Sequence, residues 1–186
     1  MIKFINFFEK IDKSQNGIAI NNEVYDISSI YPDSLIKLIS DGNLNNESFH
    51  NELTNNLNKF PKSNYHFSDL QNSNQNDSFG LNIPYIPSEV WACGVTYLRN
   101  MELHEQDIEK SDGFKGLYSY VYDSERPEIF FKALGHHCVG TNEYVSIRSD
   151  SNETFIEAEL AMIFNSQGDV IGYTAANDIT AWDIEK

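Results

Sequence analysis

The start of the chain alternates hydrophobic and polar positions in the short runs that are typical of β-strands. The runs KFINFFEK (3–10) and GIAINNEVYDI (17–27) each predict strand structure. Asn21 and Asn22 interrupt the second run, and asparagine pairs of this kind favour a tight turn. We therefore expect a strand followed by a hairpin at the beginning of the chain.

Two helical patterns follow these strands. The run SLIKLISDGN (34–43) predicts a short helix that ends near its glycine, and a second helical stretch covers 47–59 and ends before Pro61. Together with the strands they predict a small accessory α+β domain over residues 1–70.

The composition changes after this domain. The stretch QNSNQNDSFG is polar and rich in residues that break helices and strands, and we interpret 71–86 as a linker. Residues 87–186 are rich in apolar and aromatic strand formers, with one charged helix between Tyr97 and about Lys110. The predicted fold class is α+β, mostly β.

The last part of the chain reads as a β-hairpin that carries three carboxylates. In FIEAELAMIFNSQGDVIGYTAANDITAWD, two alternating apolar runs flank a Ser-Gln-Gly-Asp turn. If the turn is centred between Gln167 and Gly168, Glu157 lies opposite Asp178, and Glu159 points to the same face. Directly opposed residues of an antiparallel pair have Cβ atoms only ~5 Å apart.

Two interpretations of this trio are open. Acidic residues on a strand most often mark a solvated face. Three carboxylates at such short range also repel one another unless a cation lies between them, and hard oxygen donors suit Mg²⁺ or Mn²⁺. The small residues Thr174 and Ala176, opposite Ala161 and Glu159, leave room for a ligand and favour the metal interpretation. The register depends on a tight turn, because a bulge would shift it by one residue.

The segment ERPEIFFKA carries a second group of polar residues. Pro127 marks the start of a strand, whose alternation puts Arg126, Glu128, Phe130 and Lys132 on one face. A Glu and a Lys on one strand face usually form a surface ion pair. The neighbouring run is strongly apolar, so burial is expected here, and burial raises the pKa of a glutamate toward neutrality, where it serves as an acid or a base.

The segment IRSD leaves two roles open for its arginine. Arg148 and Asp150, two residues apart, are expected to share a face. The guanidinium either clamps a substrate carboxylate or pairs with Asp150.

Charge and cysteine content limit the possible partners. The chain has 13 basic and 28 acidic residues, a net charge of -15, which excludes a nucleic acid or an anionic membrane as an expected partner. Cys93 and Cys138 lack a metal-binding spacing and predict free thiols in a reducing, cytoplasmic compartment. The first residues show neither a signal peptide nor a membrane span.

From about position 87 to 185 the chain resembles the fumarylacetoacetate hydrolase superfamily. The resemblance is carried by the ordered strings SEVWACGVTYLRN, YDSERPEIFFKA, CVG, IRSDS, FIEAEL and GYTAANDITAWDIE. The strings VYDSERPEIFFK and RSDS are most similar to the branch that contains 2-keto-3-deoxy-D-arabinonate dehydratase. The resemblance implies a mixed β-sandwich roll, incomplete in this chain and preceded by a small N-terminal domain.

The resemblance also implies a chemistry. It implies a magnesium site, which Mn²⁺ or Ca²⁺ could also occupy, at the three carboxylates of the hairpin, and a 2-oxo acid substrate. The implied reaction is the dehydration of a 2-keto-3-deoxy sugar acid, such as 2-keto-3-deoxy-D-arabinonate, through a Mg-stabilised enolate in a homodimer. Glu128 is then expected to transfer protons, and Lys132 and Arg148 to orient the substrate carboxylate.

Three features depart from the pattern of the family. Asn100 stands where C–C-cleaving members carry a histidine base, which disfavours a C–C hydrolase or decarboxylase and fits the dehydratase branch. Trp182 stands where the family has an arginine. The sequence ends at Lys186, before the position of an active-site lysine and several closing strands, so a fragment or a non-catalytic remnant is expected.

Overall fold

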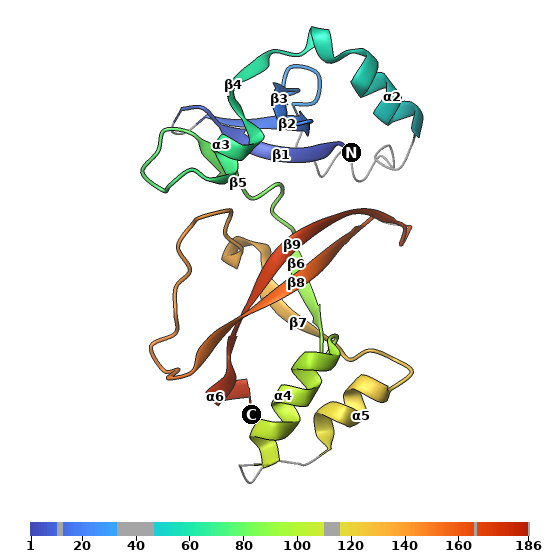
Figure 1. The fold of residues 1–186 in the computed structure, drawn as a ribbon, viewed down its shortest axis with the longest axis vertical. Helices are drawn as coiled ribbons and strands as arrows, with labels where there is room; N and C mark the ends of the chain where they lie inside the picture. Colours follow the sequence, from blue (N-terminus) through green and yellow to red (C-terminus); the bar gives the residue numbers. More distant parts are fainter. Residues whose placement is uncertain (11–12, 33–46, 110–115, 166, 186) are drawn as a thin grey trace. The chain divides into compact units, whose positions relative to one another are not determined.

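The protein is described by a computed structural model over residues 1–10, 13–32, 47–109, 116–165 and 167–185. The chain forms two compact units: Met1–Tyr85 together with Val139–Glu185, and Ile86–Cys138 (Figure 1). The fold is mixed α+β and mostly β, as predicted. No helix within these residues combines the length and the apolar character that a membrane crossing requires.

A five-stranded antiparallel sheet forms the N-terminal part of the first unit. The strands lie in the order β4-β3-β2-β1-β5. Asn21 and Asn22 join β2 to β3 with positive φ angles of 49° and 73°, which confirms the predicted turn. The strands are β1 (Lys3–Phe8), β2 (Ser14–Ile20), β3 (Glu23–Asp26), β4 (Lys62–His66) and β5 (Gly80–Asn82).

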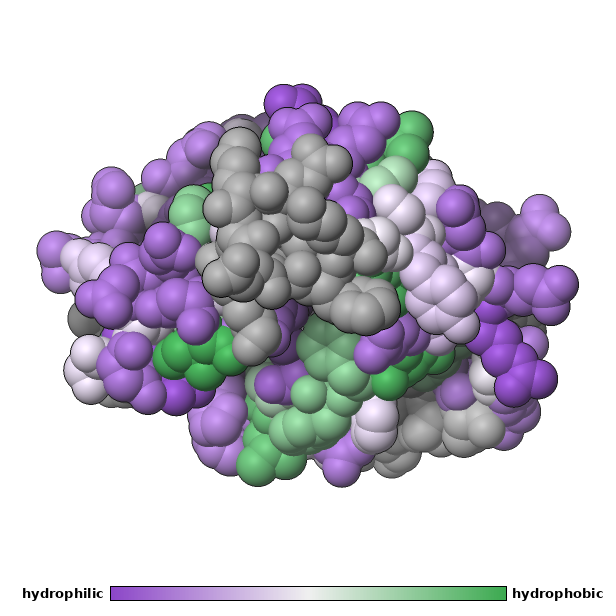
Figure 2. All heavy atoms as spheres, turned by 90° about the horizontal axis from the view of Figure 1, so that it is seen from below, coloured by the Kyte–Doolittle hydropathy of each residue, from purple (hydrophilic) through white to green (hydrophobic). Residues whose placement is uncertain are grey.

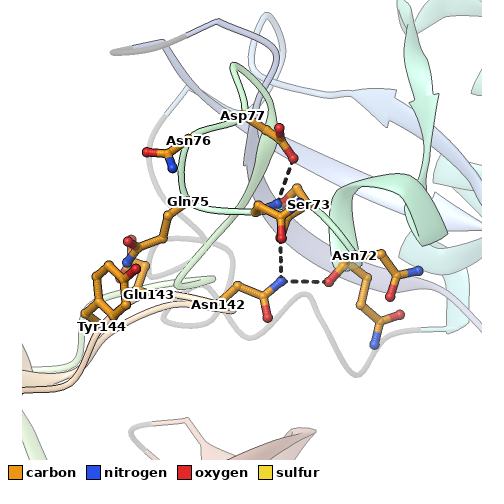
Figure 3. Close-up of a pocket in the computed structure, with 10 residues that line it drawn as sticks. Asn72, Ser73, Gln75, Asn76, Asp77, Asn142, Glu143 and Tyr144 are labelled. Carbon is orange, nitrogen blue, oxygen red and sulfur yellow. Dashed lines mark hydrogen bonds between the residues drawn. The ribbon is translucent and has the colours of Figure 1, made fainter.

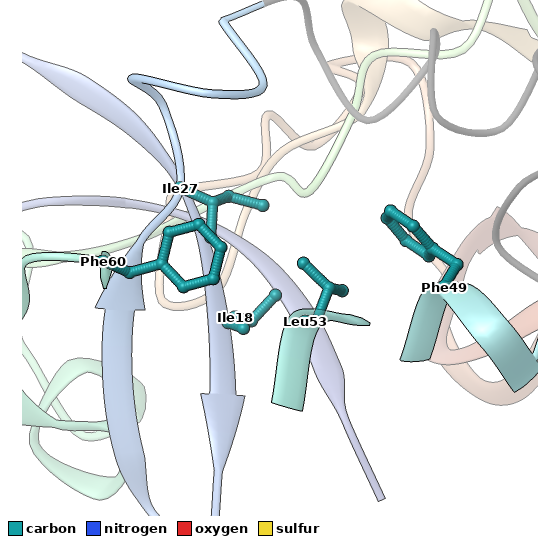
Figure 4. Close-up of a cluster of buried hydrophobic side chains, with 5 residues drawn as sticks. All are labelled: Ile18, Ile27, Phe49, Leu53 and Phe60. Atoms are coloured by element: carbon teal, nitrogen blue, oxygen red, sulfur yellow. The ribbon is translucent and has the colours of Figure 1, made fainter. Parts of the chain in front are cut away.

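Apolar side chains cover both faces of this sheet. On one face Phe49 and Leu53 of α2 (Glu47–Asn55) pack with Ile18, Ile27 and Phe60 (Figure 4). The other face carries a second buried cluster of Ile5, Phe7, Ala19, Val24 and Leu70. The helical pattern predicted for 47–59 is confirmed as α2 followed by the 3-10 helix η2 (Leu57–Lys59). The helix predicted for 34–43 lies outside the described residues.

The segment interpreted as a linker contributes to the same sheet. It begins at the end of α3 (Phe67–Gln71) and contains β5, which pairs with β1. Gly80 is required there, because a Cβ at this position would lie 2.7 Å from Ser73 Oγ. The Asn142 side chain donates to the carbonyl oxygens of Gln71 (3.1 Å) and Ser73 (2.7 Å), in a polar pocket lined by 71–77 and 142–144 (Figure 3).

The described residues of the second unit form a two-stranded sheet, two α-helices and a 3-10 helix. The strands β6 (Glu89–Cys93) and β7 (Ile129–Leu134) pair antiparallel, and the 3-10 helix η3 (Gly135–His137) follows β7. The predicted charged helix is present as α4 (Leu98–Glu109).

The prediction of a single helix between the strands of this unit was wrong. Residues Leu117–Asp123 form a second helix, α5, although its tyrosines and valine favour strands. The Glu105 carboxylate of α4 accepts the backbone N–H groups of Ser119 (2.9 Å) and Gly116 (3.0 Å) at the start of α5. These bonds, that of Ser119 first, lower the pKa of Glu105 below its usual value. A contact from α4 thus outweighs local strand propensity.

Candidate metal centre

The three predicted carboxylates lie on a long, twisted strand pair, β8 (Thr154–Phe164) and β9 (Val170–Ala181) (Figure 1). Glu157 pairs with Asp178, and Glu159 pairs with Ala176. Ala161 lies opposite Thr174. The register predicted from the centre of the turn is therefore confirmed at these positions.

The turn of the hairpin differs from the tight turn that was expected, although the register of the carboxylates is the same. At the turn, Phe164 pairs with Val170, one residue out of the predicted register, and Ile171 is the extra residue of a β-bulge that restores it. The turn is closed by Asn165, whose side-chain oxygen accepts the N–H groups of the residues at 167 (3.0 Å) and 169 (2.9 Å). Gly168 supplies the positive φ of 88° that this turn needs. The turn shifts the pairing by one residue, and the bulge shifts it back.

The carboxylates of β8 lie on its more protected face. Glu157, Glu159 and Asp178 are all half-buried. The opposite face of β8 is apolar and open to solvent, with Ile156 71% and Leu160 61% exposed. Apolar side chains also reach the surface between hydrophilic ones in the view of Figure 2. A strand whose acidic residues only mark a solvated face would show the reverse pattern, so this arrangement supports the metal interpretation.

The donor chemistry of the trio fits a hard divalent cation, although the side chains do not converge. Trp182 Nε1 donates to Glu157 Oε1 (2.8 Å), and Thr180 Oγ1 to Asp178 Oδ1 (3.5 Å). Among the described residues, no group of three or more His, Cys, Asp or Glu side chains is arranged closely enough to hold a metal ion. The backbone register brings the three predicted ligand positions onto one face, and cation binding would require the side chains to draw together there.

Arg148 forms the ion pair that was one of its two predicted roles. Its Nε and Nη2 donate to the two carboxylate oxygens of Asp150 at 2.8 and 2.7 Å, and both side chains are exposed. This bidentate bond lowers the pKa of Asp150. The substrate-binding role of Arg148 stays a prediction, and it requires the guanidinium to leave or share Asp150.

Glu128 and Lys132 lie in the second unit. Glu128 directly precedes β7, and Lys132 is part of this strand. The expectation that Glu128 is buried was wrong: it is exposed, and it lies just before β7 instead of within the strand. Lys132 is half-buried, and it is the extra residue of a bulge, since Val90 pairs with Ala133 and Trp91 with Phe131. A bulge re-aims the side chain that it carries. The catalytic role of Glu128 and the substrate-binding role of Lys132 stay predictions.

The predicted free cysteines are present, with Cys93 exposed and Cys138 half-buried. Burial raises the pKa of the Cys138 thiol, which makes it a poor nucleophile at neutral pH. Sequence reasoning gave no role to Trp182, which contacts a predicted ligand. The pattern of β8 and β9 carries no signal for this contact, because it depends on how the chain turns after β9.

Comparison with known proteins supports the interpretation. Over 120 residues, 64% of its length, the chain is 41% identical to a 2-dehydro-3-deoxy-D-arabinonate dehydratase from Saccharolobus solfataricus. Over 103 residues it is 36% identical to a probable 2-keto-3-deoxyxylonate dehydratase from Haloferax volcanii. No protein-family model matches the chain.

Solved structures show the same relationship in three dimensions. A 2-keto-3-deoxy-D-arabinonate dehydratase complexed with magnesium and 2,5-dioxopentanoate matches the whole chain with a TM-score of 0.72 and 28% identity. A fumarylacetoacetate hydrolase from Exiguobacterium antarcticum matches with a TM-score of 0.59 and 20% identity, which shows the fold alone. The resemblance seen in the sequence is thus confirmed for the dehydratases in sequence and structure, and for the hydrolase in fold alone. The matched segments cover 40% and 34% of the two relatives, and the chain spans 57% of the dehydratase structure.

Proposed function

We propose that this chain provides the metal-binding strands of a hydro-lyase that dehydrates a 2-keto-3-deoxy sugar acid. The observation that carries the proposal is the register of β8 and β9, which sets Glu157 opposite Asp178 with Glu159 on the same half-buried face. The dehydratase names of the similar proteins, and the magnesium named with one of them, support the same chemistry.

Glu157, Glu159 and Asp178 are the residues proposed to hold Mg²⁺. When bound, the cation supplies Lewis acidity, which stabilises the negative charge that develops on a 2-oxo acid as its C3 proton leaves. The carboxylates also bring three negative charges to one face, so a 2-oxo acid anion is not attracted there without the cation. The trio thus makes substrate binding depend on metal binding.

Residues outside the hairpin are proposed to position the substrate and move protons. Arg148 presents a planar fork of N–H donors, and its bond to Asp150 shows that it can bind a carboxylate through two donors. Lys132 is proposed to act with it on the substrate carboxylate. Glu128 is proposed to transfer the proton at C3 or at the departing C4 hydroxyl.

Isothermal titration calorimetry tests the metal-binding part of the proposal. We expect the 186-residue chain to bind oxalate, a mimic of a 2-oxo acid enolate, only in the presence of Mg²⁺. Glu157→Ala should abolish this binding, and Glu102→Ala, which removes an exposed carboxylate from α4, should leave it unchanged. Equal oxalate binding with and without Mg²⁺ would sink the proposal.

The reaction products separate dehydration from C–C cleavage. With 2-keto-3-deoxy-D-arabinonate as substrate, loss of water yields 2,5-dioxopentanoate, the compound named in the similar structure. A C–C hydrolase or decarboxylase yields shorter carbon fragments, which proton NMR of the reaction mixture resolves. Asn100 lies in α4 and cannot serve as the histidine base that C–C cleavage would use, so dehydration is the proposed outcome.

A further inference from the structure

Trp182 is held by the residue just before β8, Glu153, and by Phe155 and Glu157 within β8. It begins α6 (Trp182–Glu185), directly after β9. Its backbone N–H donates to the Glu153 carbonyl (2.9 Å), and its ring stacks on Phe155 with centroids 4.2 Å apart. Its indole Nε1–H donates to Glu157 Oε1 (2.8 Å). Phe155 and Glu157 are two residues apart on β8 and share a face, so the Trp182 side chain contacts both.

The neighbouring residue fixes the start of α6 against β8. The Asp183 carboxylate accepts the Ser151 hydroxyl (2.7 Å) and the Asn152 N–H (2.8 Å), just before β8. The Asn152 bond is the main cause of a lowered pKa at Asp183. Trp182 therefore has little freedom to move away from Glu157. Its ring packs on β8, and its backbone N–H bonds the residue just before β8.

We infer that Trp182 is a positioning residue, which orients the Glu157 carboxylate toward the divalent cation of the proposed site. This inference rests on the proposed function of the carboxylate trio. The indole bond engages Oε1 and would leave the other oxygen of the same carboxylate, Oε2, for the cation. An indole N–H is a neutral donor, so it fixes the rotamer without placing a positive charge beside the metal. Such outer contacts to ligands typically change metal affinity 10- to 100-fold.

The chain offers a matched control for this contact. It has two tryptophans, and Trp91 on β6 makes the same kind of bond, donating from Nε1 to Glu89 Oε2 (3.0 Å). Neither Trp91 nor Glu89 belongs to the proposed site. Trp182→Phe and Trp91→Phe therefore each remove one indole N–H bond to a glutamate, and only the first touches a proposed ligand.

Titration of the two variants with Mn²⁺ measures the difference. Trp182→Phe keeps an aromatic ring beside Phe155, and we expect it to weaken Mn²⁺ binding about 10-fold, the lower end of the range for such contacts. Trp91→Phe should bind Mn²⁺ as the wild type does. Equal or tighter binding by Trp182→Phe would overturn the inference, and tighter binding would mean that the indole competes with the cation.

Fluorescence provides a second readout that does not need the Trp182→Phe variant to fold. In Trp91→Phe the emission comes from Trp182 alone, and Mn²⁺, a paramagnetic quencher, should reduce it over the concentration range of binding. Unchanged emission at saturating Mn²⁺ would contradict contact between Trp182 and a ligand. If the wild type binds no Mn²⁺, the proposed site fails and the inference fails with it. If the wild type binds and only these two tests fail, the site stands without the role of Trp182.

Discussion

Replacing Asp178 with asparagine should stabilise the metal-free chain. Asp178 lies directly opposite Glu157, so their Cβ atoms lie ~5 Å apart, and Glu159 adds a third charge on the same face. Two like charges at about 5 Å repel by ~0.8 kcal/mol at the dielectric constant of water and by ~3 kcal/mol at an effective value of 20. The side chains are half-buried, which places the repulsion between these limits. We expect Asp178→Asn to raise the free energy of unfolding by about 1 kcal/mol, or the melting temperature by roughly 2–4 °C.

Magnesium should reverse this order of stability. A ligand at 100 times its Kd stabilises the folded state by ~2.7 kcal/mol, and Asp178→Asn should gain far less because it lacks one charged ligand. The assay is thermal unfolding at low salt, with and without Mg²⁺, of the wild type, Asp178→Asn and the exposed control Glu102→Gln. Added NaCl should reduce the metal-free difference by screening. The reasoning is refuted if Asp178→Asn destabilises the metal-free chain. It is also refuted if Mg²⁺ stabilises the Asp178→Asn variant as much as it stabilises the wild type.

Two further predictions concern a buried leucine in the first unit and a helix cap in the second. Leu53, 1% exposed, should lose about 2–5 kcal/mol of folding free energy on change to alanine, while Leu160→Ala, at an exposed site, should cost far less in the same urea titration; equal costs would contradict the assigned core. Glu105→Gln should speed hydrogen exchange at the Ser119 amide. Because the pKa of Glu105 is lowered in the folded state, its stabilising effect is complete above the ordinary carboxyl range near pH 4.3 and is lost as the pH falls through the folded value. An exchange rate unaffected by the substitution would refute this capping role.

The register of the site was predictable from the sequence for a physical reason. A slip of one residue moves every side chain to the other face, so the alternation on β8 and β9 strongly constrains their pairing. The pattern could not reveal that a longer turn and the bulge at Ile171 offset each other. The predicted pairing of Glu157 with Asp178 was therefore correct, while the turn geometry from which it was deduced was not.

The features that sequence reasoning missed depend on contacts between distant segments. The helix α5 is capped by Glu105 of another helix, and the three-residue strand β5 gains its place by pairing with β1. Whether Glu128 is buried depends on what covers the end of β7, which alternation within the strand does not show. The Trp182–Glu157 bond requires the turn into α6, which lies beyond the periodic pattern.

The claim that Glu157, Glu159 and Asp178 form a divalent cation site is tested most directly by diffraction at the manganese edge. Crystals of the chain grown with Mn²⁺ should show one strong anomalous peak on the half-buried face of β8 and β9. Carboxylate oxygens of all three residues should lie within about 2.0–2.6 Å of it, the range for hard cations. Saturating Mn²⁺ with no anomalous peak at these residues, or with a peak that leaves Asp178 out, would contradict the account.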